Sequence, residues 1–205
     1  MPKFIYIFLI LCSVGYSQTK MSTTESNVLR KKVKEQAAIT KTIVSDFVQY
    51  KHLDFLANDI ESSGKLAFKS PNMVKWAYVT PFQYAVIFKD EKLYINDEGK
   101  KSDVDLSSSK LFKRLNQLII SSVKGDMFNE EEFEITYFIK GNKSEVNFKP
   151  KNKKLIKYIS NFQILFSTSG EVVEVKMIEP SGDYTQIIFK NRKVNTPLLD
   201  AVFIN

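Results

Sequence analysis

The side chains of this sequence that could perform chemistry are few and isolated. His52 is the single histidine, and no cysteine or second histidine stands near it as a further metal ligand. The run Glu130 to Glu132 precedes an expected strand, a position typical of a solvated turn rather than of an acid/base pair. Ser181-Gly182-Asp183 has the composition of a turn, and the sequence lacks a glycine-rich phosphate loop and a nucleophile elbow. We therefore expect no enzyme, no metal site and no cofactor.

The amino-terminal residues have the organisation of a secretory signal. Lys3 precedes an apolar run from Phe4 to about Val14, and small residues follow up to Ser17. The run is shorter than the ~20 residues of a membrane-spanning helix, which argues against an anchor. Lipidation at Cys12 is another alternative, but a bulky residue precedes it where a lipoprotein signal has a small one. We predict a signal peptide over 1–17, one domain over 18–205, and export to the periplasm.

Composition and charge narrow the class of protein further. With 43% hydrophobic and 26% charged residues, a chain of 205 residues can form one domain with a substantial core. Cleavage after residue 17 removes one charged residue, Lys3, so the formal charge of +7 becomes +6, and it also removes the single cysteine. Disulfides are then excluded. A basic exported protein suits an anionic membrane surface or an acidic partner better than nucleic acid, unless its lysines form only a solvated surface. We expect a monomer without a nucleic-acid partner.

Hydrophobic spacing predicts a mainly β protein with two principal helices. Ser22 to Glu25 has the spacing of a capping box, and Leu29, Val33 and Ala37 then recur four apart, as in an amphipathic helix. A second helical stripe, with leucines at 111, 115 and 118, is expected to end near Gly125. We expect a barrel or a strongly curved antiparallel sheet with helical cover. Alternating apolar and polar residues predict strands over 42–52, 63–69, 73–80, 83–90, 91–97, 132–141, 143–150, 159–168, 171–179 and 183–191.

Large apolar residues share one face of the strands in the first half of this sheet. Val74, Trp76 and Tyr78 alternate along one strand, and the same spacing continues after Pro81 as far as Phe88. Later strands supply further large groups, such as Met177. The interior of a barrel of this size holds either packed side chains or one ligand, and the pattern alone is compatible with both.

The stretch Gly64 to Asp97 combines a glycine-led strand, a Pro-Asn turn, an aromatic strand centred on Trp76, a proline and a further strand. In this order of features it resembles the LolA-like outer-membrane lipoprotein carrier family. Supporting matches are Phe47 and Gln49, the internal helix, and the segments 179–183 and 189–191. The resemblance covers about residues 39–195.

The resemblance implies an incomplete antiparallel β-barrel (a half-barrel) with an N-terminal helix and a helical lid over an apolar cavity. It implies a carrier that shuttles acylated lipoproteins through the periplasm from the inner to the outer membrane. Its expected partners are an inner-membrane lipoprotein-releasing transporter and an outer-membrane acceptor. In the family a basic residue linked to lid closure often precedes the proline of the Pro-Asn turn, whereas here Ser70 holds that position beside Lys69.

We predict that Trp76 lies on the inner face of the sheet and faces Leu115 or Leu118 of the lid. The full set of residues predicted to contact lipid has two parts, a cavity wall and a lid. The wall comprises Leu66, Phe68, Val74, Trp76, Tyr78, Tyr84, Val86, Phe88, Phe162, Ile164 and Phe166, and the lid comprises Leu111, Phe112, Leu115, Leu118 and Ile119.

Two other functions stay open on the sequence. An envelope sensor or regulatory module could use the same half-barrel to recognise exposed acyl chains and pass the signal to a protein partner. A lipid hydrolase would need a nucleophile and a base, which we do not find in the sequence.

Overall fold

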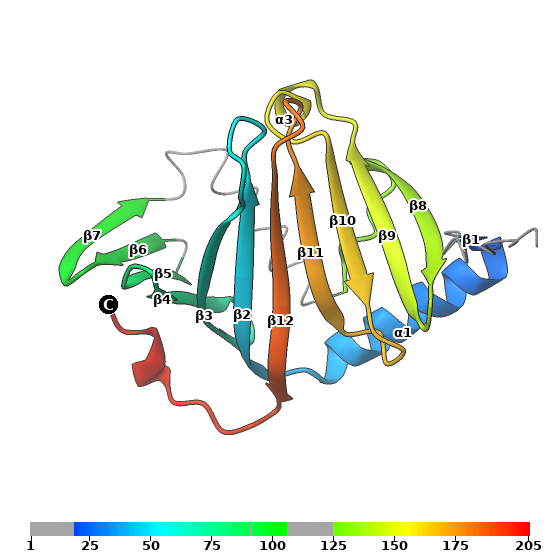
Figure 1. The fold of residues 1–205 in the computed structure, drawn as a ribbon. Coiled ribbons are helices and arrows are strands. Elements are labelled where there is room, and N and C mark those ends of the chain that lie inside the picture. The colour runs from blue at the N-terminus through cyan, green and yellow to red at the C-terminus, as the bar shows by residue number, and fades with distance from the viewer. Residues whose placement is uncertain (1–18, 91, 106–124) are drawn as a thin grey trace, which may run out of the picture.

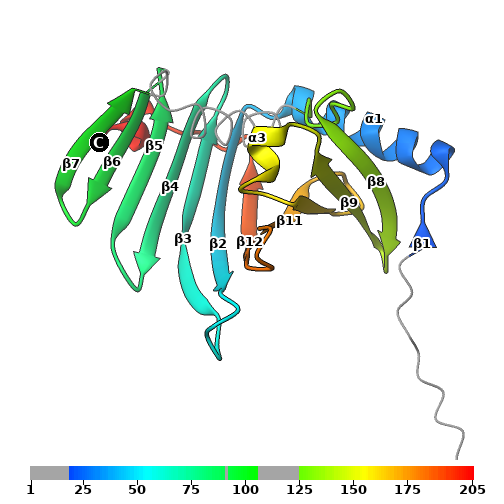
Figure 2. The same cartoon turned by 90° about the horizontal axis from the view of Figure 1, so that it is seen from above.

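The computed structural model describes residues 19–90, 92–105 and 125–205, whose strands join one antiparallel sheet (Figures 1 and 2). The strand order is β1-β8-β9-β10-β11-β12-β2-β3-β4-β5-β6-β7, so β1 and β7 stand at the two ends. The sheet is strongly curved, and α1 runs alongside its β8–β12 half (Figure 2). The elements are β1 (Thr19–Lys20), α1 (Thr23–Ile39), β2 (Thr42–His52), β3 (Ile60–Lys69), β4 (Met73–Thr80), β5 (Tyr84–Lys89), β6 (Lys92–Asp97), β7 (Lys100–Asp105), β8 (Phe133–Lys140), β9 (Lys143–Pro150), α3 (Lys153–Ile156), β10 (Asn161–Phe166), β11 (Val172–Ile178), β12 (Tyr184–Val194) and the 3₁₀ helix η2 (Asp200–Phe203).

The predicted fold class is confirmed, because the chain forms a mainly β, open antiparallel sheet that curves into an incomplete barrel. The ten predicted strands correspond to β2–β6 and β8–β12. Two strands were not predicted: β1, which has two residues, and β7, which is rich in charged residues. Such end strands face solvent along one edge and carry a weak hydrophobic signal. The predicted lid helix, with residues 111–119, lies outside the described residues.

The predicted capping box begins α1. The Ser22 hydroxyl accepts a hydrogen bond from the Glu25 amide at 3.3 Å, and the Glu25 carboxylate accepts one from the Ser22 amide at 2.8 Å. These two bonds satisfy amide groups that have no partner within the helix. Leu29 and Val33 then form the buried stripe that packs α1 against the sheet.

Apolar side chains on the concave face form two buried clusters. The first joins α1 to β8–β11 and includes Val33, Phe148 and Phe166. The second joins β2–β6 with β12 and includes Phe47 and Val74, which are 1% and 0% exposed. Because strand side chains alternate between faces, one face of each strand supplies these clusters. The core therefore lies inside the curve of the sheet.

Gly64 of β3 makes room for the aromatic centre of the second cluster. The Phe47 ring lies 5.1 Å from the rings of both Trp76 and Tyr78, in edge-to-face contacts. A Cβ atom on Gly64 would lie 2.7 Å from the Phe47 ring and 2.2 Å from the backbone oxygen of Ala77. Glycine is required here because the neighbouring strand and the Phe47 ring leave no space for a side chain.

The C-terminal segment after β12 packs on the opposite, convex face of β3–β6. Phe203 of η2 is 2% exposed and contacts this face through a third buried cluster. Lys69 donates to the Leu198 carbonyl at 2.8 Å and to the Asp200 carboxylate at 2.6 Å. Lys69, the basic residue beside Ser70, is thus directed toward the C-terminal segment.

Candidate functional site

The concave face of the sheet holds a cavity of about 410 Å³ between the two inner clusters. Helix α1 contributes Val33 and Ala37 to its wall, and strands from both halves of the sheet contribute most of the rest. Most of the lining side chains are aliphatic or aromatic. This volume lies within the roughly 300–1,000 Å³ typical of small-molecule sites.

The structure brings together eight of the residues predicted for the wall. Their side chains come from β3, β4, β5 and β10, and each strand contributes alternate positions because these face the concave side. The eight are Leu66, Trp76, Tyr78, Tyr84, Val86, Phe88, Phe162 and Ile164.

The remaining predicted residues fall into two groups. Phe68, Val74 and Phe166 are 2%, 0% and 0% exposed and belong to the inner clusters, but they are not among the lining residues. They support the wall from within the core. Leu111, Phe112, Leu115, Leu118 and Ile119 lie outside the described residues, so the pairing of Trp76 with Leu115 or Leu118 stays a prediction.

The contributions of α1 and β12 were not predicted from the sequence, and of the lining residues of β11 only Met177 was. The alternation of Thr185, Ile187 and Phe189 along β12 was a usable signal, since all three line the cavity. The α1 positions were predicted to be apolar without a known partner surface. The assembled sheet provides the surface on which α1 packs. In this sheet β12 lies between β11 and β2 and so joins the two halves.

Two aromatic residues of the wall, Tyr78 and Trp76, have buried polar atoms. The Tyr78 hydroxyl donates to the Gln49 side chain at 2.9 Å, and burial raises the pKa of Tyr78 above its usual value. The hydroxyl therefore stays neutral at physiological pH. The Trp76 ring packs at 6.0 Å from Phe189 of β12, and its buried indole nitrogen has no hydrogen-bond partner among the described residues.

Arg192 and Glu171 form an ion pair within this wall, with a separation of 3.6 Å between Nε and Oε1. Their side chains are 21% and 27% exposed. Burial lowers the pKa of Arg192, and the Glu171 carboxylate partly offsets this effect. The guanidinium remains cationic, because its ordinary pKa is far above neutral. The cavity thus combines an apolar wall with one charged pair among its described lining residues.

The groups first considered for chemistry lie elsewhere and have structural partners. His52 Nδ1 lies 2.8 Å from an Asp59 oxygen, and its ring stacks on Tyr184. The run Glu130 to Glu132 is exposed in a turn, as predicted. Asp183 closes the predicted turn at 181–183 and accepts from the Asp54 amide, which lowers the pKa of Asp183. Nowhere in the described ranges do three or more histidine, cysteine or acidic side chains gather in a possible metal site.

The comparison with protein families identifies the chain. A family model described as outer membrane lipoprotein carrier protein LolA matches residues 38–204. This chain belongs to the LolA family. The resemblance of the Gly64–Asp97 stretch is thereby confirmed. Within the described residues, no helix of this LolA-family chain is long and apolar enough to cross a membrane.

Relatives named outer-membrane lipoprotein carrier protein extend the match. One from Pseudomonas paraeruginosa is 30% identical over 139 residues, which are 67% of this chain, and the chain spans 64% of that relative's length. Another, from Azotobacter vinelandii, is 24% identical over 201 residues, and this match covers 97% of this chain and 93% of the length of that relative. The second match includes almost the whole chain at lower identity.

A solved structure shows the same fold at low sequence identity. The lipoprotein LppX of Mycobacterium tuberculosis superimposes with a TM-score of 0.50 and 9% identity, and the match covers 87% of this chain and 99% of LppX. The LolA superfamily protein NE2245 from Nitrosomonas europaea gives a TM-score of 0.48 with 11% identity. This match covers 87% of this chain and 97% of the NE2245 chain.

Proposed function

We propose that this LolA-family protein is a periplasmic carrier that binds the acyl chains of lipoproteins in its cavity and shuttles them from the inner to the outer membrane. The observation that carries the proposal is the cavity of about 410 Å³ with its largely apolar wall. The names of its relatives, outer-membrane lipoprotein carrier proteins, support the same cargo.

The energetics of acyl chains suit such an enclosure. Exposing an acyl chain of about 15 methylenes to water costs about 12 kcal/mol of free energy, at ~0.8 kcal/mol for each methylene. A protein that moves this cargo through water must cover most of that surface. Val86, Ile164 and Ile187, from both halves of the sheet, offer apolar contacts of the required kind. Carriage of this sort needs no nucleophile or general base, so we propose no enzymatic activity.

The same proposal covers location and partners. Residues 1–17 would act as a cleaved export signal that directs the protein to the periplasm. Cargo would come from an inner-membrane lipoprotein-releasing transporter and pass to an outer-membrane acceptor. We propose that the protein acts as a monomer and binds no nucleic acid.

Trp76 provides the test, because it is the single tryptophan and it lines the cavity. Acyl chains that carry bromine atoms quench indole fluorescence on contact. We expect a brominated lysolipid to quench Trp76 saturably, and an unbrominated lysolipid to reverse the quenching by competition. A lack of saturable quenching, together with no lipid or lipoprotein in mass spectra of protein purified from its native envelope, would contradict the proposal. The sensor alternative predicts a regulatory membrane protein in pull-downs instead of a transporter.

A further inference from the structure

A β-bulge in β12 turns Arg192 into the cavity. Thr185, Ile187 and Phe189 line the cavity at alternate positions, so regular alternation would next place residue 191 on the inner face. The pairing of β12 with β2 instead jumps from Lys190 opposite Asp46 to Lys193 opposite Val44. Extra residues in one strand shift the facing of the side chains that follow. Arg192 therefore lines the cavity.

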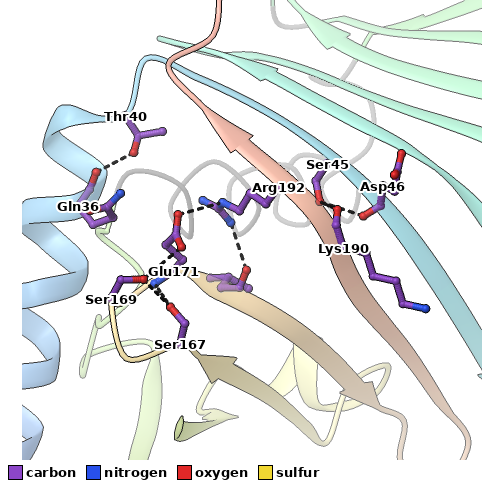
Figure 3. Close-up of polar contacts among 10 residues, drawn as sticks. Gln36, Thr40, Ser45, Asp46, Ser167, Ser169, Glu171, Lys190 and Arg192 are labelled. Atoms are coloured by element: carbon purple, nitrogen blue, oxygen red, sulfur yellow. Dashed lines mark hydrogen bonds and ion pairs between the residues drawn. The ribbon is translucent and has the colours of Figure 1, made fainter. Parts of the chain in front are cut away.

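Neighbouring polar groups brace this bulge, among them the Ser45 hydroxyl beside Lys190 (Figure 3). Asn191 has a φ of 52°, a left-handed conformation that asparagine tolerates better than most residues. The Asn191 side chain donates to the Asp46 carboxylate at 2.8 Å. Ser45, which is 1% exposed, donates to the Lys190 carbonyl at 2.8 Å. The Ser45 bond gives the Lys190 carbonyl a partner at the irregular pairing, and the Asn191–Asp46 bond links β12 to β2 beside it.

The guanidinium of Arg192 is only partly satisfied by protein groups. Its Nη1 donates to the Val172 carbonyl at 3.1 Å, while Nε lies 3.6 Å from Glu171 Oε1 and finds no hydrogen-bond partner in the described part of the chain. The Glu171 carboxylate is itself held by the Ser169 hydroxyl at 3.1 Å. A guanidinium has five N–H donors, and because Nε is buried, the donors that Arg192 keeps for a ligand are those left on Nη1 and Nη2. Its 21% exposed side chain is accessible there.

Glu171 determines which acceptor suits these donors. An ionised carboxylate that approached Arg192 would also approach Glu171 and meet like-charge repulsion, which the apolar surroundings strengthen. An ester or amide carbonyl accepts hydrogen bonds without a net charge and avoids this repulsion. Gln36 of α1 and Thr40, which caps the end of α1, also line the cavity and are uncharged, so they add no charge that would favour a carboxylate.

We propose that the Arg192–Glu171 pair is a polar subsite that binds the neutral carbonyl of an acyl ester or amide and discriminates against the ionised carboxylate of a free fatty acid. The inference rests on the proposed function, because it assumes that acyl chains occupy the apolar wall. It adds a chemical selectivity: the protein accepts acyl chains attached to a larger molecule and rejects the free acids from which they are made.

The experiment compares palmitate with palmitic acid methyl ester at pH 8, by displacement of a fluorescent acyl probe. We expect the unmodified protein to bind the ester more tightly. In the isosteric variant Glu171→Gln the affinity for palmitate should rise about tenfold relative to the ester, since a hydrogen bond to a charged group is then formed without repulsion. Glu174→Gln is the matched control. Glu174 precedes the inner-facing Val175 on β11, so its side chain points to the other face, where it accepts a hydrogen bond from Gln186. It should leave the ratio unchanged.

Arg192→Met tests the donor directly, and its thermal melting curve shows whether it folds. We expect the affinity for the ester to fall about tenfold, while binding of an alkane without a carbonyl stays unchanged. If the unmodified protein binds acyl ligands but Glu171→Gln leaves the acid-to-ester ratio unchanged, the subsite is wrong and the carrier function stands. If no acyl ligand binds at all, both fall. A diacylglycerol and a synthetic diacylated lipopeptide, compared in the same assay, distinguish the two sources of the ester.

Discussion

Ile187 and Ile188 form a natural pair for testing the cavity, since they are chemically identical neighbours on opposite faces of β12. Ile187 lines the cavity, and its register partners are Val175 and Gln49. Ile188 points to the other face, and its partners are Glu174 and Val48. We predict that Ile187→Glu weakens acyl binding strongly, whereas Ile188→Glu leaves it close to that of the unmodified protein.

The magnitude follows from the apolar contact that is lost. Burial of an isoleucine side chain contributes about 1.5 to 3 kcal/mol, and a bound acyl chain would complete the burial of Ile187. An ionised carboxylate in its place must also lose water when the ligand covers it. We therefore expect a loss of about 2 to 3 kcal/mol in binding free energy, which corresponds to roughly 30- to 150-fold in Kd.

The assay is displacement of a fluorescent acyl ester probe, with circular dichroism to verify that both variants keep their β-structure. A pH series adds an internal control. Because a protonated carboxyl is neutral, Ile187→Glu should regain part of its affinity at pH 5, and Ile188→Glu should show no such recovery. Equal losses in both variants, or no loss in Ile187→Glu, would refute the placement of acyl chains against the concave face.

Two further predictions concern the scaffold. Gly64→Ala should lower the free energy of unfolding by about 2 kcal/mol or more, because the added methyl would clash with the neighbouring strand and the Phe47 ring. Chemical denaturation measures this change, and an unchanged denaturation midpoint would contradict the close packing at Gly64. The hydrogen bond from Lys69 holds the pKa of the Asp200 carboxyl below its usual value. The contact therefore stabilises the C-terminal segment fully at pH values above the unfolded-state pKa of about 3.9. This stabilisation is lost as the pH falls through the lower pKa of the folded state. We expect hydrogen-exchange protection around Phe203 to fall below about pH 4, and Asp200→Asn to show the lower protection already at pH 7.

Much of the fold could be predicted from local patterns in the sequence. The capping box at Ser22 predicted the start of α1, because it depends on residues three apart in one segment. The alternation of Val74, Trp76 and Tyr78 predicted their common face, since successive side chains on a strand point to opposite sides. Eight of the predicted wall residues line one cavity for the same reason.

Other features depended on how distant segments pair. β7 and η2 were not predicted, because the charged residues of β7 and the four residues of η2 have little periodicity of their own. Phe203 is buried only because the C-terminal segment returns to the convex face of β3–β6. No spacing within the last residues indicates which face of the sheet receives them.

Arg192 shows the division between sequence and structure most clearly. By itself the sequence determined which side chains share a face of each strand, because that depends on the local two-residue period. On that period alone, Asn191 would follow Phe189 on the inner face. The tertiary structure decided otherwise, since pairing with β2 introduces a bulge after Lys190 and places Arg192 beside Glu171 in the cavity. Strand register is set by contacts between segments about 145 residues apart, such as that of Ser45 with Lys190, and these contacts form only when the whole sheet assembles.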